Sequence, residues 1–197
     1  MLKRFFDIFF STLGLIILSP LFLIVAIWIR IDSKGPIFYK QVRVGKGNKD
    51  FLLYKFRSMR IGADKGSLIT IGGRDPRVTP SGYWIRKFKL DELPQLINVL
   101  KGDMSIVGPR PEVRRYVDLY TPEQLKVLTV RPGITDLASI KYRNENELLS
   151  SQSDPEQYYI THIMPDKLKY NIEYVEKHNL LYDCKLILKT ILVIIKE

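Results

Sequence analysis

Cysteine and histidine are scarce in this chain of 197 residues, which contains Cys184, His162 and His178 and no others. A single cysteine cannot form an internal disulfide, and these three residues are too few for the common zinc sites, so a disulfide scaffold and structural zinc are excluded. The P-loop, the Gly-x-Gly-x-x-Gly fingerprint and the His-Glu-x-x-His motif are also missing. The chain therefore lacks the familiar signatures of nucleotide-binding proteins and zinc hydrolases.

Acidic residues are too few to balance the basic ones, and the formal net charge is +10. Residues 34–115 hold 18 of the 31 lysines and arginines but only 7 of the 21 acidic residues. Such a block requires an anionic partner, which is a nucleic acid, a phosphorylated metabolite or an anionic lipid. No helix-turn-helix or RNA-recognition pattern is evident, so nucleic acid is not expected.

Charge is absent from residues 8–29, an apolar stretch of membrane length with no cleavage site for a signal peptide. Pro20 lies near its middle, where it removes a helical hydrogen bond and predicts a kink. These residues fit a single membrane span that tolerates the proline. They fit equally a helix that breaks at Ser19-Pro20 and returns to the face it entered, with the Ser19 hydroxyl serving the freed carbonyl.

The rest of the chain predicts an α+β fold that is mostly helical. Residues 37–44 and 51–56 favour strands and flank a Gly- and Asn-rich turn, so we expect a β-hairpin. Seven glycines and prolines in residues 60–82 predict a basic loop with little regular structure. Leu93, Leu96, Ile97 and Leu100 keep the spacing of one apolar helix face, and Gly102 is placed to end that helix. Residues 180–195 fit an interfacial helix or a core helix equally well.

Asp91-Glu92-Leu93-Pro94 opens the predicted apolar-striped helix. A purely structural reading is strong, because aspartate is a preferred N-cap and proline is tolerated in a first turn. The functional reading is that two adjacent carboxylates inside the most basic block provide a nucleophile and a metal ligand for phosphate chemistry. Gly108-Pro109-Arg110-Pro111 and Arg131-Pro132-Gly133 each hold an arginine in a rigid turn, which fits a guanidinium positioned for phosphate binding, but each string taken alone fits a plain loop with an exposed arginine better.

Taken together, these strings resemble the small, catalytic-domain-only kind of bacterial monotopic phosphoglycosyl transferase over nearly the whole chain. The matching strings are Lys3-Arg4-x-x-Asp7, Ser19-Pro20, Tyr54-Lys55-Phe56-Arg57-Ser58-Met59, Gly73-Arg74-Asp75-Pro76-Arg77-Val78-Thr79, Leu90-Asp91-Glu92-Leu93-Pro94-Gln95-Leu96, Asn98-Val99-Leu100-Lys101-Gly102-Asp103-Met104-Ser105, Val107-Gly108-Pro109-Arg110-Pro111 and Arg131-Pro132-Gly133-Ile134-Thr135. Each string is weak alone, but their order is specific.

The resemblance implies transfer of a phosphosugar from a UDP-sugar, expected to be N-acetylated, to polyprenyl (undecaprenyl) phosphate, with release of UMP. It implies Mg²⁺ and a covalent aspartyl-phosphosugar intermediate. The other expected partners are membrane lipids, and a homodimer is the oligomer to be considered. The expected location is the cytoplasmic face of a bacterial inner membrane, with residues 1–33 as a re-entrant membrane helix and residues 34–197 as an interfacial catalytic domain.

Carried onto single residues, the resemblance makes Asp91 the nucleophile and Glu92 its partner in handling Mg²⁺ and the acceptor phosphate. It assigns Arg86, Arg110, Arg131 and Arg143 to substrate, Ser19 and Pro20 to the break in the membrane helix, and Lys3, Arg4 and Asp7 to an interfacial anchor. Asp136, Ser139 and Asn171 depart from the residues that many such proteins have, which leaves the sugar open.

Two hypotheses from other classes are an inert membrane-surface scaffold, which does not need the Asp91-Glu92 pair, and a membrane-tethered nucleic-acid binder, which would use the basic block.

Overall fold

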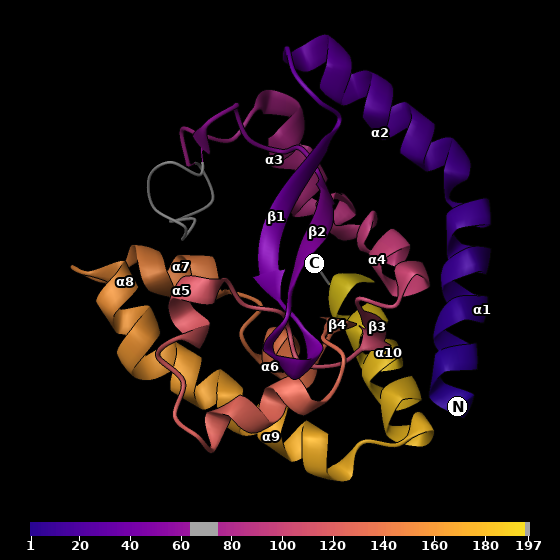
Figure 1. Cartoon of the computed structure of the whole chain (residues 1–197). Helices are drawn as coiled ribbons and strands as arrows, with labels where there is room; N and C mark the ends of the chain where they lie inside the picture. Colours follow the sequence, from indigo (N-terminus) through magenta and orange to yellow (C-terminus); the bar gives the residue numbers. More distant parts are fainter. Residues whose placement is uncertain (64–74, 196–197) are drawn as a thin grey trace.

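The computed structural model describes residues 1–63 and 75–195 (Figure 1). The elements in chain order are α1 (Leu2–Ile17), α2 (Ser19–Asp32), β1 (Phe38–Val44), η1 (Lys46–Asn48), β2 (Asp50–Phe56), α3 (Pro80–Lys87), η3 (Leu90–Glu92), α4 (Gln95–Lys101), β3 (Ser105–Val107), α5 (Arg114–Val117), η4 (Gln124–Thr129), β4 (Gly133–Thr135), α6 (Leu137–Lys141), α7 (Glu145–Ser150), α8 (Pro155–Tyr158), η5 (Tyr159–Ile163), α9 (Met164–Lys177) and α10 (Leu180–Ile195). The described part of the chain is mostly helical, as the sequence predicts, and contains two small two-stranded sheets. Residues 64–74 of the expected basic loop, with Gly73-Arg74 of the matching strings, lie outside the described residues.

The predicted kink near Pro20 is confirmed, because α1 and α2 meet at a bend of 61°. Pro20 cannot donate to the carbonyl of Ile16 four residues earlier, and the Ser19 hydroxyl donates to that oxygen instead, at 2.8 Å. Within the described residues, no single helix has both the length and the apolarity to cross a membrane, and only this bent pair passes that test together. Figure 1 shows the pair as an arm along one edge of the molecule.

Polar side chains on α1 fasten this arm to the rest of the fold. Asp7 is buried and accepts hydrogen bonds from the Ser105 hydroxyl and the Ile106 backbone N–H, each at 3.0 Å. Lys3 forms an ion pair with Asp183, which is also buried, on α10. The residues expected to anchor the chain at a membrane surface thus join α1 to β3 and α10.

The outer surface of the arm is strongly apolar. Large hydrophobic side chains along α1 and α2, among them Phe5, Phe9 and Leu23, are more than half exposed. The inner face of α2 instead buries Val25 and Ile29 in a core with β2 and α3. The arm therefore shares a core with the following domain on one side and leaves an apolar face open on the other.

The end of α2 also positions α3, the helix that carries Arg86. Asp32 accepts hydrogen bonds from the Ser81 hydroxyl at 2.7 Å and the Ser81 N–H at 3.2 Å, in the first turn of α3. Thr79 caps the same helix by accepting from the Gly82 N–H at 3.0 Å.

The predicted hairpin is confirmed as the antiparallel pair β1–β2, with Phe38 opposite Phe56 and Val44 opposite Asp50. Along β1, the half-buried residues Tyr39, Gln41 and Arg43 alternate with exposed ones, as a strand with one covered face requires. Lys55 on β2 lies opposite Tyr39 and therefore projects from the same face. This face forms one wall of the cavity described below.

The predicted helix is α4, and Gly102 ends it in the left-handed conformation with φ 92°. The four apolar residues of the predicted face, Leu93, Leu96, Ile97 and Leu100, are half-buried, and the fully buried residues of α4 are Gln95, Asn98 and Val99.

Hydrogen bonds explain the difference. The Asn98 side chain accepts from the Tyr54 N–H at 2.9 Å and donates to the Leu52 carbonyl at 2.7 Å, so the buried face of α4 is a polar connection to β2. At the other end of α4, Arg4 of α1 donates to the free carbonyls of Val99 and Leu100.

A second sheet, not predicted from the sequence, consists of the short parallel strands β3 and β4. Beside this sheet, the backbone of Gly108 packs directly against the backbone of Gly133. A Cβ atom on Gly133 would lie 2.1 Å from the Gly108 nitrogen. Since only glycine fits both positions, this contact fixes the loop that carries Arg110.

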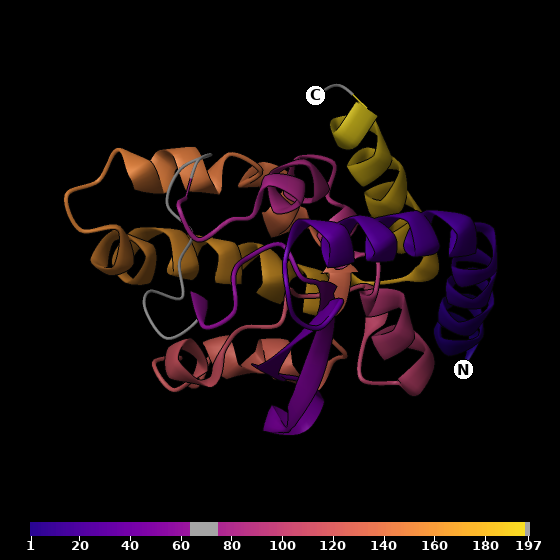
Figure 2. The ribbon, with the colours of Figure 1, turned by 90° about the horizontal axis from the view of Figure 1, so that it is seen from above.

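Helix α10 has two different faces. Asp183 and Leu186 are buried against the core, while Leu181, Leu188 and Leu192 are each more than half exposed. Figure 2 shows α10 beside the α1–α2 arm when the molecule is seen from above. The sequence left interfacial and core readings open, and the structure combines a core-facing side with an exposed apolar side.

Candidate active site

A cavity of about 790 Å³ opens between the hairpin, the η3 turn, the Arg110 loop and the helices from α6 to α9. Of the six residues predicted for catalysis and substrate binding, five line it: Arg86, Asp91, Glu92, Arg110 and Arg143. A cavity of this size holds a ligand much larger than a phosphate ion. The structure therefore brings together residues that are up to 57 positions apart in the chain.

The two carboxylates lie in the 3-10 turn η3 and not in the helix that follows. Lys89, just before the turn, adopts the left-handed conformation with φ 55°, so the chain turns sharply after α3. The N-cap of α4 is Pro94, and no side chain of the described residues caps the N-terminus of that helix. Asp91 is therefore not an N-cap, and its carboxylate is 7% exposed at the cavity wall.

Two cations hold the Glu92 carboxylate. Arg110 donates to both oxygens, from Nη1 to Oε2 at 3.1 Å and from Nη2 to Oε1. Lys55 Nζ donates to Oε1 at 2.8 Å and lies 4.0 Å from Asp91 Oδ2. Glu92 is thus held by two cations, whereas the only contact of the Asp91 carboxylate within residues 1–63 and 75–195 is the longer one with Lys55.

These contacts give the two neighbouring carboxylates different pKa values. Burial, together with the charge of Glu92, raises the pKa of Asp91, although Lys55, Arg86 and Arg110 oppose the shift. For Glu92, burial also acts to raise the pKa, but Arg110 and Lys55 outweigh it and hold the pKa well below its usual range. Such divergence between adjacent groups is typical of sites in which they play different roles.

Arg86 and Arg143 line the same cavity and are not occupied by protein partners. Arg86 is half-buried and lowers the pKa of Asp91 by its charge, while Arg143 is exposed. Neither guanidinium has a hydrogen bond or ion pair within residues 1–63 and 75–195. Both are therefore free to bind an anionic ligand next to the carboxylates.

Arg131, the sixth predicted residue, does not line the cavity. Its Nε donates to the Gly102 carbonyl at 2.8 Å, at the end of α4. The structure thus gives Arg131 a helix-capping contact and does not bring it to the carboxylates.

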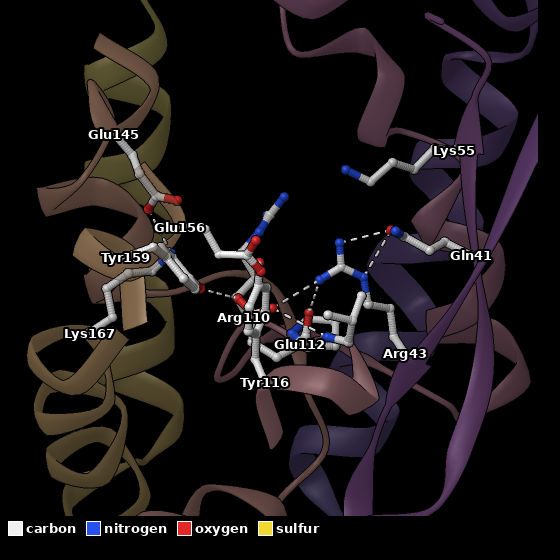
Figure 3. A network of polar contacts seen from close by, with 12 residues as sticks. Gln41, Arg43, Lys55, Arg110, Glu112, Tyr116, Glu145, Glu156, Tyr159 and Lys167 are labelled. Carbon is white, nitrogen blue, oxygen red and sulfur yellow. Dashed lines mark hydrogen bonds and ion pairs between the residues drawn. The ribbon is translucent and has the colours of Figure 1, made fainter. Parts of the chain in front are cut away.

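The sequence reading missed a second group of polar residues along the same cavity, which Figure 3 shows in close-up. It comprises Gln41, Arg43, Glu112, Glu145, Tyr159 and Lys167, and Lys55 was missed as well. Only the alternation of Tyr39, Gln41 and Arg43 along one strand was a usable signal. The others are single polar residues with no spacing that sets them apart.

Two of the residues expected to depart from the pattern of similar proteins contact each other. Asp136 is fully buried and caps α6 by accepting from the Ser139 N–H at 2.8 Å and the Ser139 hydroxyl at 2.6 Å. Ser139 also lines the cavity. The third, Asn171, is buried on α9, and its Oδ1 has no hydrogen-bond partner within the described part of the chain.

The described residues contain no group of three or more His, Cys, Asp or Glu side chains that could hold a metal ion. Mg²⁺ usually binds one or two carboxylates and completes its shell with water and substrate phosphates. Asp91 and Glu92 fit that donor set, since they are two carboxylates on the wall of a cavity that Arg86 and Arg143 also line. They fit a metal shared with a phosphorylated substrate better than a cage built by the protein alone.

Comparison with known proteins gives a family model, described as bacterial sugar transferase, that matches residues 1–197. The chain is 38% identical over 193 residues to the UDP-N-acetylgalactosamine-undecaprenyl-phosphate N-acetylgalactosaminephosphotransferase of Aeromonas hydrophila, covering 96% of this chain and 43% of that protein. It is 35% identical over 196 residues to the UDP-glucose:undecaprenyl-phosphate glucose-1-phosphate transferase of Escherichia coli (strain K12), covering 97% of this chain and 39% of that protein.

A shorter relative is the exopolysaccharide production protein PSS of Rhizobium leguminosarum bv. phaseoli, 45% identical over 147 residues, which are 71% of this chain and 74% of that protein. The chain thus spans less than half the length of the Aeromonas and Escherichia proteins.

Proposed function

The chain belongs to the bacterial sugar transferase family, and on that premise we propose that it transfers a sugar phosphate from a UDP-sugar to undecaprenyl phosphate, with release of UMP. The observation that carries the proposal is that Asp91 and Glu92 lie at the wall of one cavity with Arg86 and Arg143, whose guanidinium groups have no protein partner within the described residues. Relatives named for UDP-N-acetylgalactosamine and for UDP-glucose support the donor and acceptor classes.

In the proposed reaction, the cations of the cavity bind the diphosphate of the donor. Arg86 and Arg143 have no protein partner to give up within the described chain, and Arg110 can exchange part of its contact with Glu92 for a phosphate oxygen. An Asp91 oxygen then attacks the phosphorus that bears the sugar, and the bond from that phosphorus to UMP breaks. The products of this step are an aspartyl-phosphosugar and UMP.

In the second step, an oxygen of the acceptor phosphate attacks the same phosphorus. The bond to Asp91 breaks, which restores the carboxylate and gives the diphosphate-linked sugar. Asp91 suits the nucleophile because, within the described residues, its carboxylate has only the 4.0 Å contact with Lys55, whereas Glu92 is held by Arg110 and Lys55. When Mg²⁺ is bound by these carboxylates and the substrate phosphates, it supplies positive charge that reduces the repulsion between them.

The proposal places the reaction at the cytoplasmic face of the bacterial inner membrane. The donor is water-soluble and the acceptor is a lipid, so their phosphates can meet only at the membrane surface. The α1–α2 arm, re-entrant in this proposal, would lie in the lipid with its exposed apolar face, and the apolar face of α10 would add to the contact. A scaffold without activity would not need the buried pair of carboxylates.

The test is UMP release by the purified protein with UDP-sugars, undecaprenyl phosphate and Mg²⁺. We expect Asp91→Asn to lower the rate on the order of a thousandfold or more, with or without acceptor, because an amide cannot form the acyl phosphate. Asp118→Asn, an exposed change, is the control. Mass spectrometry of the unmodified protein without acceptor should find a phosphosugar on Asp91. An adduct on another residue, or full activity of Asp91→Asn, would contradict the mechanism.

A further inference from the structure

The cavity has two chemically different parts. Lys55, Arg86 and Arg110 lie near Asp91 and Glu92 in this lining, so the cations there outnumber the two carboxylates. A second group of polar lining residues, which we call the neutral wall, consists of Gln41, Arg43, Glu112, Glu145, Tyr159 and Lys167. The positive charges of Arg43 and Lys167 balance the negative charges of Glu112 and Glu145 in this group. The first part suits phosphates, and the second suits a ligand that is polar but uncharged.

One half of the neutral wall is built around Glu112. Tyr159 donates its hydroxyl to Glu112 Oε1 at 2.5 Å, and Arg43 Nη1 lies 3.4 Å from Oε2. Arg43 also donates to Gln41 Oε1 from Nε at 3.0 Å and from Nη2 at 2.8 Å. Figure 3 shows this chain of contacts running from the hairpin to the helical side of the cavity. The side chains are held in place before any ligand arrives.

The other half is the pair formed by Lys167 of α9 and Glu145 of α7. Lys167 Nζ donates to Glu145 Oε2 at 2.8 Å and lies 5.6 Å from the centre of the Tyr159 ring. The Lys167 side chain is 10% exposed and that of Glu145 is 24% exposed. Glu145 Oε1 has no hydrogen-bond partner within the described residues, so this oxygen is free to accept one.

Tyr159 begins the π-helical turn η5 between α8 and α9. Such turns are rare and occur frequently at functional sites, because the extra residue changes which side chains face a neighbour. Here the turn includes Tyr159, the residue that contacts both Glu112 and Lys167.

We propose that the neutral wall binds the hydroxyl groups of a sugar ring of the donor, and that Glu145 and Lys167 determine specificity. A carboxylate accepts hydrogen bonds from two hydroxyls, and an ammonium donates to hydroxyl oxygens, so the pair matches neighbouring hydroxyls in one arrangement better than in another. The hexose and the ribose of a UDP-sugar both carry such hydroxyls. This inference rests on the proposed function, because it assumes a sugar nucleotide as donor.

Glu145→Gln is the main test, because the amide keeps the volume but loses the charge and one acceptor. Its matched control is Glu147→Gln, an exposed change two residues away that does not line the cavity. Lys167→Met is the second variant, and Lys169→Met on the same helix is its control. Each protein is assayed with UDP-glucose and UDP-N-acetylgalactosamine for UMP release, and its affinity for both donors and for UMP is measured by calorimetry.

We expect Glu145→Gln and Lys167→Met to lower kcat/KM or affinity for at least one donor about tenfold or more, and to change the ratio between the two donors. If affinity for UMP stays within about twofold of the control, the hexose is the bound ring. If the affinity for UMP falls together with the affinity for both donors, the bound ring is the ribose. Values within about twofold of the controls for both donors and UMP would overturn the inference.

The binding measurements keep the inference separate from the proposed function. A protein that binds UDP-sugars through Glu145 but releases no UMP with any acceptor would contradict the proposed function alone. A protein that releases UMP with donor preferences unaffected in both variants would contradict this inference alone.

Discussion

The Nζ atom of Lys55 lies 2.8 Å from Oε1 of Glu92, so the second strand of the hairpin supplies a cation to a turn 37 residues further along the chain. Together with Arg110, Lys55 balances the negative charge of Glu92, one of the two adjacent carboxylates at the cavity wall.

Lys55→Met is expected to lower kcat/KM roughly 100-fold, because it removes one preorganised cation from a site that must bind phosphates beside two carboxylates. Lys40→Met on the neighbouring strand is the control, since Lys40 is exposed and does not line the cavity. Steady-state kinetics of UMP release is the measurement. Equal activity of the two variants would show that the contact between Lys55 and Glu92 does not matter for turnover.

Arg110 and Arg131 stand in similar proline-containing turns, but the structure predicts opposite results for their alanine variants. Arg110→Ala should lower kcat/KM about 100-fold, because Glu92 and the substrate phosphates both lose a guanidinium. Arg131→Ala should leave kcat/KM within about twofold and remove about 1 kcal/mol of stability with the bond to Gly102. A large rise in KM for Arg131→Ala would instead support its predicted contact with substrate.

The Glu112 carboxylate should make the stability of the protein depend on pH. Burial acts to raise its pKa, but Arg43, Lys167 and the hydrogen bond from Tyr159 outweigh burial, and the pKa is lowered from 4.5. A carboxyl with a lowered pKa stabilises the folded state above its unfolded pKa, and this stabilisation is lost as the pH falls through the folded value. The Tm advantage over Glu112→Gln should be largest near neutral pH and should narrow below about pH 4.5. A constant difference in Tm down to about pH 3 would contradict the assignment.

Gly133→Ala should destabilise the fold by about 2 to 3 kcal/mol, because its Cβ would overlap the backbone of Gly108. Activity should fall by more than the loss of stability explains, because the backbone displaced at Gly108 belongs to the loop that carries Arg110. Gly47→Ala in the hairpin turn is the control. Its Cβ would have no atom within 4 Å, and the positive φ of residue 47 should lower the stability by about 1 kcal/mol. Denaturant unfolding and UMP release measure the two effects, and equal stability of the variants would refute the close contact.

The bend at Ser19 and Pro20 can be tested as a membrane topology. With Cys184 replaced by serine, cysteines at Leu2 and at Lys34 should both be labelled from the cytoplasmic side, as should a reference cysteine at Lys49 in the hairpin turn. Changing Ser19 and Pro20 to leucine should restore a continuous helix and move some molecules to a full span, with loss of activity. Labelling of position 2 only from the periplasm would identify a single-span protein.

Local patterns were sufficient to predict several elements. The alternation in residues 37–44 and 51–56 with a Gly- and Asn-rich turn predicted the hairpin, Gly102 the end of α4, and Pro20 the bend, because backbone geometry is set within a few residues there. Five of the six predicted catalytic and substrate-binding residues line one cavity. Asp91, Glu92 and Arg110 stand in the matching strings, whereas Arg86 and Arg143 were assigned by the resemblance outside those strings.

The remaining features depend on contacts between distant residues. Strands β3 and β4 have three residues each, too few for any periodicity to be recognised. The buried face of α4 is polar because Asn98 meets the backbone of β2, a contact that hydrophobic spacing cannot anticipate. Glu112, Glu145 and Lys167 are ordinary polar residues in the sequence and become a group only when β1, α7 and α9 surround one cavity.

The contacts of α1 have a consequence for the order in which the chain is completed. Asp7 is bound by Ser105, 98 residues later, and Lys3 by Asp183, 180 residues later. At 5 to 20 residues per second, ribosomal synthesis of that second interval takes on the order of 10 to 40 s. For part of this time α1 has left the ribosome while Ser105 and Asp183 have not yet been made. Helix α1 therefore reaches its final place only after α10 has been translated.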